Sequence, residues 1–288
     1  MKKYFSLVLF AHSIFALPFA LIGFFLGVTT TPNPFNWLLL ALVLLCMVFA
    51  RNAAMAFNRY LDRNIDAKNP RTQMRDIPAG KISANEALIF VIINCVLFIT
   101  TIAFINSLCF YLSPVALFVV LFYSYTKRFT ALCHMVLGLG LSLAPIGAYI
   151  AVTGAFSIVP VLYSFAVLFW VSGFDIIYAL QHEDFDRNEK LHSIPAAMGI
   201  KNALNLSVVL HVFSALCVIL PVMFTTFSWV YYVGVAFFCF MLTYQHLLVK
   251  PNDISKVNKA FATTNGFASV IFAICFLIDA FLRTNFNF

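Results

Sequence analysis

Residues 36–66 read NWLLLALVLLCMVFARNAAMAFNRYLDRNID, a long apolar run that ends in a cluster of charged and amide side chains. The apolar part, residues 36–57, has the length of about 20 residues that a helix needs to cross about 30 Å of hydrocarbon. Lipid offers backbone polar groups no hydrogen-bond partner, so a segment that crosses it must satisfy them internally, as a helix does. The stretch therefore predicts a membrane-spanning helix with a polar end.

Apolar runs of similar length recur through the whole chain. Of its 288 residues, 62% are hydrophobic and only 10% are charged, and the mean hydropathy is +0.94. A soluble domain of this length would need more charge to cover its surface. We therefore expect an all-α integral membrane protein, a single domain over residues 1–288 built as a bundle of about nine transmembrane helices. The predicted spans are 5–29, 36–57, 84–105, 108–125, 131–153, 157–180, 202–225, 228–248 and 263–283.

Positive charge is distributed unevenly between the predicted loops. When the 18 Lys and Arg residues are assigned to alternating sides of the membrane, only Arg283 falls on the side opposite the N-terminus. Because loops rich in Lys and Arg remain in the cytoplasm, we expect a cytoplasmic N-terminus and cytoplasmic loops at 58–83 and 181–201. The net charge of +7 follows from this topology and does not indicate a nucleic-acid partner. Function is expected in these longer loops, on the cytoplasmic side.

The end of the second span carries a polar stripe. Arg51, Asn58, Asp62 and Asp66 are separated by seven, four and four residues, a spacing that places them on one face of a helix. Polar groups at or inside the end of a membrane helix are energetically expensive and usually serve function.

A second polar stripe closes the sixth span. Asp175, Tyr178, His182 and Asp186 lie at offsets of zero, three, seven and eleven, again on one helical face. Four crossings separate the two stripes, so both face the same compartment. Two carboxylate stripes that meet would repel each other unless a cation lay between them, and oxygen ligands favour Mg²⁺. The alternative is that these acids only form ordinary ion pairs with nearby Arg residues. Two stripes with matching one-face spacing disfavour that explanation.

Four motifs in chain order resemble those of the UbiA superfamily of intramembrane prenyltransferases. They are Asn58-x-x-x-Asp62-x-x-x-Asp66, the element Arg71-Thr-x-x-Arg75-x-x-Pro78-x-Gly80, Tyr123-x-x-x-Lys127, and Asp175-Ile-Ile-Tyr178 with Asp186. The resemblance covers essentially the whole chain and implies Mg²⁺-dependent transfer of a prenyl group from a diphosphate.

The resemblance also implies roles for individual residues. The implied metal ligands are Asn58, Asp62, Asp66, Asp175 and Asp186. The implied diphosphate-binding residues are Arg51, Arg59, Arg71, Arg75 and Lys127. The implied catalytic residues are Asp62, Asp66, Asp175, Tyr123, Lys127 and Tyr178. His182 stands where the family commonly has Asp, so either His182 ligates the metal or Glu183 or a water replaces the missing carboxylate.

The second acidic motif looks most like that of the 4-hydroxybenzoate polyprenyltransferase group, which includes relatives in menaquinone synthesis. The expected substrates are then a polyprenyl diphosphate and an aromatic hydroxy acid, either 4-hydroxybenzoate or a hydroxynaphthoate, in the cytoplasmic (inner) membrane of a bacterium. Two alternatives stay open: another acceptor of this superfamily, such as homogentisate, haem or a lipid phosphate, and an ion-coupled transporter. A transporter would place its charges near the midplane, whereas these acids cluster at one membrane face.

Overall fold

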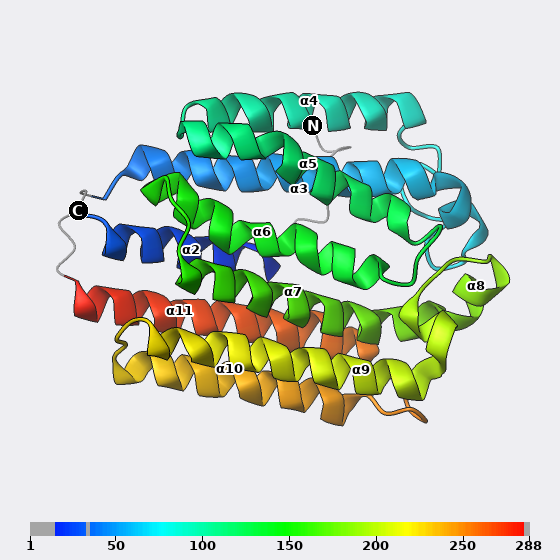
Figure 1. Ribbon diagram of the computed structural model, residues 1–288. Helices are drawn as coiled ribbons and strands as arrows, with labels where there is room; N and C mark the ends of the chain where they lie inside the picture. The colour runs from blue at the N-terminus through cyan, green and yellow to red at the C-terminus, as the bar shows by residue number, and fades with distance from the viewer. Residues whose placement is uncertain (1–14, 33–34, 285–288) are drawn as a thin grey trace.

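The computed structural model describes residues 15–32 and 35–284, and in these ranges the chain is a bundle of helices (Figure 1). The long helices are α2 (Leu17–Thr30), α3 (Trp37–Lys68), α4 (Ala84–Ala103), α5 (Ser107–Thr126), α6 (Cys133–Thr153), α7 (Ile158–Ala179), α9 (Ile194–Ile219), α10 (Trp229–Leu248) and α11 (Asn265–Arg283). The short ones are η2 (Leu180–His182), α8 (Glu183–Asn188), η3 (Leu220–Met223) and the π-helical turn η4 (Lys259–Thr264). Apart from one isolated bridge, the described residues form no β-structure, which confirms the predicted all-α fold.

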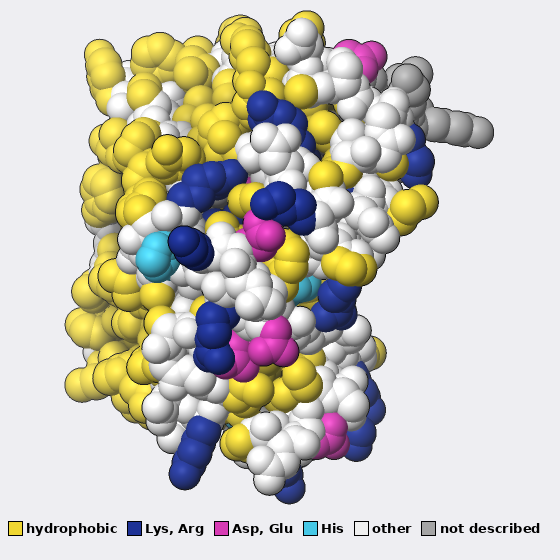
Figure 2. All heavy atoms as spheres, turned by 90° about the vertical axis from the view of Figure 1, so that its right-hand side faces the viewer, with side chains coloured by type: hydrophobic (Ala, Val, Ile, Leu, Met, Phe, Trp, Pro, Cys, Tyr) yellow, Lys and Arg dark blue, Asp and Glu magenta, His cyan; other side chains and the backbone are white. Residues whose placement is uncertain are grey.

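The spans agree with the predicted bundle. In the described part of the chain, eight helices are long and apolar enough to cross a membrane. α2 is apolar but shorter, and residues 5–14 of the predicted first span lie outside the described residues. The helices run side by side, and the connections that follow α3, α5, α7 and α10 lie at one end of the bundle (Figure 1). Figure 2 looks onto that end, where charged side chains gather beside a broad hydrophobic flank on the left of the view. That this end is cytoplasmic stays a prediction.

Helix α3 is longer than its predicted span. It continues about three turns beyond residue 57 and ends at Lys68. Within this extension Asn58 donates from its side-chain amide to Asp62 at 3.1 Å, one turn further along. The polar stripe therefore lies on a continuous helix, which projects the acids from the apolar part of α3 towards the charged end of the bundle.

Two other boundaries differ from the predictions. The prediction of one continuous helical face over residues 175–186 is wrong, because α7 ends at Ala179 and a 3₁₀ turn separates it from α8. α9 begins at Ile194 rather than at residue 202, with the hydroxyl of Ser193 accepting from the N–H of Ala196. Its first turns include Gly199, whose φ of 77° kinks the helix. The length of apolar runs does not predict this part of the helix, because the kink and the polar residues interrupt the apolar pattern.

Helix α7 is the central element that positions the second motif. It packs between α6 and α9, and Tyr163, Val167 and Trp170 on it are fully buried. The indole N–H of Trp170 donates to the side-chain oxygen of Asn265 on α11 at 2.8 Å. Because α7 is packed on several sides, the backbone of Asp175 near its end is held in a fixed position.

Helix α2 approaches α6 closely through two glycines. A Cβ atom added at Gly23 would lie 2.0 Å from the carbonyl oxygen of Pro145, and one at Gly27 would lie 2.8 Å from Cβ of Val152. A Cβ at Gly147, also on α6, would meet nothing within 4 Å. Only a residue without a side chain fits at the two α2 positions, so these glycines set the distance between the two helices.

We expect Gly23→Ala to destabilise the bundle, because the new methyl group meets backbone atoms of α6 that cannot move independently. Overpacking of this kind costs about 1–3 kcal/mol. The measurement is the midpoint of thermal denaturation of the purified protein in detergent, with Gly147→Ala as the matched control that stays near wild type. Equal midpoints for the two variants would contradict the close approach of α2 and α6.

Candidate active site

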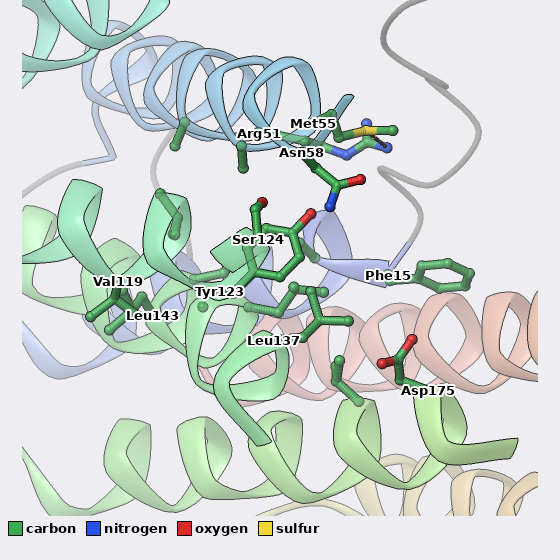
Figure 3. A pocket seen from close by; sticks show the side chains of 18 of the residues that line it. Phe15, Arg51, Met55, Asn58, Val119, Tyr123, Ser124, Leu137, Leu143 and Asp175 are labelled. Atoms are coloured by element: carbon green, nitrogen blue, oxygen red, sulfur yellow. Dashed lines mark hydrogen bonds between the residues drawn. The ribbon is translucent and has the colours of Figure 1, made fainter. Parts of the chain in front are cut away.

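A cavity of about 780 Å³ lies between α3, α5, α6 and α7 and extends to α8. Its volume falls in the range of about 300–1,000 Å³ that is typical of ligand pockets. In Figure 3, Arg51 and Asn58 enter it from α3, Asp175 enters from α7 on the other side, and Tyr123 of α5 lies between them. The wall away from these polar residues is apolar and includes Val119 and Leu143, while Leu137 lies between Tyr123 and Asp175.

Asp62 is the most tightly bound acid of the cavity. Its residue is only 1% exposed. Lys127 donates to one carboxylate oxygen at 2.5 Å and Arg128 to the other at 3.0 Å. The side-chain amide of Asn58 adds a third hydrogen bond at 3.1 Å. A buried carboxylate without such partners would cost several kcal/mol, so these contacts hold the end of α5 against α3.

Asp66, one turn further along α3, pairs with a residue of the following loop. Nη1 of Arg75 lies 2.8 Å from one carboxylate oxygen of Asp66 and 3.0 Å from the other. The backbone carbonyl of Asp66 accepts from the hydroxyl of Thr72 at 3.1 Å. The side chain of Asn69 accepts from the N–H of Arg71 at 2.9 Å. These bonds fold the loop back over the end of α3, and Arg75 thereby reaches the cavity.

Asp175 has a different kind of partner. One of its carboxylate oxygens lies 2.7 Å from Nδ1 of His134, the second residue of α6. The His134 side chain is 5% exposed and that of Asp175 is 22% exposed. Within the described residues no Lys or Arg forms an ion pair with Asp175.

The other predicted site residues lie mostly on the same cavity. Its wall also contains Arg51, Arg59, Tyr123, Tyr178, His182 and Asp186. The 3₁₀ turn after α7 therefore does not separate the four members of the second stripe. Arg71 is the exception: it is absent from the cavity wall and donates instead to the side-chain and backbone oxygens of Gln181.

The loops of the two motifs are also linked directly. Beside the contact of Arg71 with Gln181, Lys68 pairs with Glu189 at 2.6 Å. The amide of Gln181 donates to the side chain of Asn258 at 3.3 Å. The ends of α3 and α7 are therefore neighbours around one cavity, as the two acidic stripes require if they are to act together.

The acids of the cavity do not form a preassembled metal cluster. The described ranges contain no group of three or more His, Cys, Asp or Glu side chains that could hold a metal ion. The donor set still fits Mg²⁺, which prefers oxygen and is often held by one or two carboxylates together with substrate phosphates. The oxygen donors on the cavity wall are Asn58, Asp62, Asp66, Asp175 and Asp186. They suit a cation that is shared with an anionic ligand.

Two residues at the site were missed by the sequence reasoning. Arg128 was counted only as a loop cation, and His134 was not considered. Arg128 adjoins Lys127, which would have been a usable signal. His134 follows Lys127 by seven residues in the sequence. No periodic pattern connects it to Asp175, because the two residues are on different helices.

We expect Arg128→Leu to lower the midpoint of thermal denaturation, since Arg128 also donates to the backbone carbonyls of Leu61 and Ser124 at 2.9 Å each. Leaving one oxygen of a buried acid without its partner costs about 1–3 kcal/mol. Arg63→Leu is the control, because the hydrogen bond that Arg63 forms within the described residues goes to the carbonyl of Tyr60 on its own helix. The predicted coupling of α3 to α5 is wrong if both variants unfold at the same temperature.

The fold and the cavity together define a class: a polytopic membrane protein with a charged, enzyme-like cavity at one end of its helix bundle. Residues 16–272 match the UbiA prenyltransferase family. The match covers most of the chain, and the chain belongs to that family. This confirms the resemblance noted from the four motifs and the prediction of a prenyltransferase.

Bacterial proteins named 4-hydroxybenzoate octaprenyltransferase are similar to this chain over most of their length. The protein of Aliivibrio fischeri is 30% identical over 242 residues, which cover 82% of each chain. That of Nitrosomonas europaea is 28% identical over 266 residues, covering 92% of this chain and 89% of its own. That of Actinobacillus pleuropneumoniae is 29% identical over 240 residues, with coverages of 82% and 80%.

Solved structures share the fold. The apo structure of a UbiA homologue from Aeropyrum pernix K1 superposes with a TM-score of 0.84 at 32% identity, covering 93% of this chain and 98% of its own. A UbiA homologue from Archaeoglobus fulgidus, bound to GPP and Mg²⁺, has a TM-score of 0.78 at 22% identity, with coverages of 96% and 99%. The second likeness is evidence for the fold alone.

Proposed function

We propose that the protein transfers a polyprenyl group from a polyprenyl diphosphate to an aromatic hydroxy acid, 4-hydroxybenzoate or a hydroxynaphthoate, in a Mg²⁺-dependent step of quinone biosynthesis. The observation that carries the proposal is the single cavity on which two acidic motifs, several cations and an extended apolar wall come together. The names of the bacterial relatives support the acceptor, and the match to the prenyltransferase family supports the donor. The Archaeoglobus fulgidus homologue is bound to GPP and Mg²⁺, so a protein of this fold can hold both.

The polar end of the cavity is the proposed site of the diphosphate. The residues that would hold Mg²⁺ are Asn58, Asp62, Asp66, Asp175 and Asp186, while His182 contributes a nitrogen that Mg²⁺ disfavours. The bound ion would neutralise charge that develops on the leaving diphosphate. The cations assigned to the phosphate oxygens are Arg51, Arg59, Arg75 and Lys127 on the cavity wall, and Arg71 once it leaves Gln181.

Aromatic side chains surround the proposed position of the reacting carbon. Tyr123 and Tyr178 line the cavity between the two motifs, where their rings can stabilise an allylic cation or bind the diphosphate. The carbon–oxygen bond to the diphosphate breaks, and the ring carbon ortho to the phenol of the acceptor forms the new bond. A carboxylate at this end then accepts the proton from that carbon, and Asp66 is our candidate.

The apolar wall is the proposed site of the prenyl tail. Val119 and Leu143 lie along it, and exposed apolar residues such as Val115 and Phe156 also border the cavity. A polyprenyl chain can then remain among apolar side chains and lipid while its diphosphate stays at the polar end. This arrangement explains why the reaction would take place within a membrane, and we assign it to the cytoplasmic face of the bacterial inner membrane.

We expect membranes that contain the protein to convert a radiolabelled polyprenyl diphosphate and one of several phenolic acids into a prenylated product that mass spectrometry identifies. Chelation of Mg²⁺ should abolish the product. Asp62→Asn, which keeps the shape of the side chain, should reduce transfer at least about 100-fold because the leaving group loses its charge stabilisation. Asp253→Asn is the control, since Asp253 lies in an exposed loop.

Three outcomes would contradict the proposal. They are full activity of Asp62→Asn, full activity without a divalent cation, and failure of every phenolic acid while homogentisate, haem or a lipid phosphate gains a prenyl group. The last outcome would keep the family chemistry and replace the acceptor. Ion flux in liposomes without diphosphate turnover would instead favour the transporter.

A further inference from the structure

Asp175 differs from Asp62 and Asp66, the two buried acids of the cavity, in the partner that binds it. Asp62 and Asp66 are neutralised by Lys or Arg side chains. Asp175 is bound by His134 at 2.7 Å, and its side chain remains 22% exposed on the cavity wall. Among the described residues its second carboxylate oxygen has no hydrogen-bond partner. One oxygen of Asp175 is therefore fixed by His134, while the residue lines the cavity that a ligand would occupy.

The other ring nitrogen of His134, Nε2, also has a hydrogen-bond partner. The backbone N–H of Ile194 donates to Nε2 of His134 at 3.3 Å. A nitrogen that accepts a hydrogen bond offers its lone pair, so this geometry makes Nδ1 the ring nitrogen that donates to Asp175. Ile194 is the first residue of α9, where backbone N–H groups have no partner within the helix and the helix dipole is positive. Both effects favour the lone pair at Nε2 and hence donation from Nδ1 to Asp175.

The segment that supplies this N–H also reaches the first motif. The N–H of His192 donates to the backbone carbonyl of Lys127 at 2.8 Å. The same Lys127 binds Asp62 through its ammonium group at 2.5 Å. Residues 192–194 therefore lie between the supports of Asp62 and Asp175, and His134 connects this segment to Asp175.

We propose that His134 is a positioning residue of the active site, which holds the Asp175 carboxylate in the orientation that binds the divalent cation. This inference rests on the proposed function. The imidazole binds one oxygen of the carboxylate and so orients it, and the second oxygen stays available to a metal ion. Buried donors that orient a ligating carboxylate contribute to metal affinity although they never touch the ion.

The test uses Mn²⁺ as the probe, with inorganic pyrophosphate and the purified full-length protein in detergent, and measures free Mn²⁺ by electron paramagnetic resonance. We expect His134→Phe, which keeps the ring and removes both hydrogen bonds, to weaken Mn²⁺ binding by about 10–100-fold, as loss of such supporting residues does. His134→Asn can place an amide N–H near the position of Nδ1 and should recover part of the affinity. A role in packing alone would not predict this recovery.

His211→Asn is the matched control. His211 is also a buried histidine with two hydrogen-bonded nitrogens, one to His246 at 2.7 Å and one to the carbonyl of Trp170 at 3.2 Å, and it does not line the cavity. Its substitution should leave Mn²⁺ binding unchanged.

Wild-type affinity in folded His134→Phe overturns the inference and leaves the proposed metal site intact. If His134→Phe does not fold, His134→Asn decides: affinity between those of wild type and Asp175→Asn supports the inference, and affinity equal to wild type overturns it. Absence of Mn²⁺ binding by the wild-type protein overturns the proposed metal site together with the role of His134.

Discussion

Asp62 lies inside the helix bundle, where its charge is stable because Lys127 and Arg128 bind both of its oxygens. An uncompensated charge at this depth would destabilise the fold by several kcal/mol. The partners come from the end of α5, so compensation of one acid on α3 determines which helix ends meet. The cavity exists at this end of the bundle because the polar groups that must be paired are there, while its other walls are left apolar.

The two acidic motifs are compensated in different ways, and the difference affects their chemistry. On the α3 side, the cations that neutralise Asp62 and Asp66 must be displaced or shared when a metal ion binds. On the α7 side, Asp175 is bound by His134 and, among the described residues, forms no ion pair with a Lys or Arg. In the proposed mechanism, a divalent ion that enters the cavity therefore finds carboxylates without a Lys or Arg ion-pair partner in the described part of the chain on this side, at Asp175 and Asp186. The diphosphate that accompanies it can take over the Arg and Lys side chains that the first-motif acids release.

Much of the fold was predictable because the thickness of lipid sets the length of apolar runs, and the helical period placed the first acidic stripe on one continuous helix. The second stripe is divided by the 3₁₀ turn after α7, which its spacing did not predict. The start of α9 was not predictable, since Gly199 and the polar residues around it interrupt the apolar pattern. The partners of the acids were only partly predictable. Lys127 belongs to a motif, whereas the contact of His134 with Asp175 depends on how α6 packs against α7, which no spacing within one segment encodes.

The strengths of the contacts around the cavity differ between its walls and its loops. The helices that form the walls are fixed by close backbone approaches, such as that of Gly23 to Pro145, and by fully buried side chains. The links between the loops are exposed: the Lys68 side chain is 61% accessible in its pair with Glu189, and such pairs contribute only about 0–1 kcal/mol. Segments held by exposed polar contacts open at lower free energy than a packed core does. A ligand can therefore separate Arg71 from Gln181 and enter the polar end while the helices that orient the buried acids stay packed.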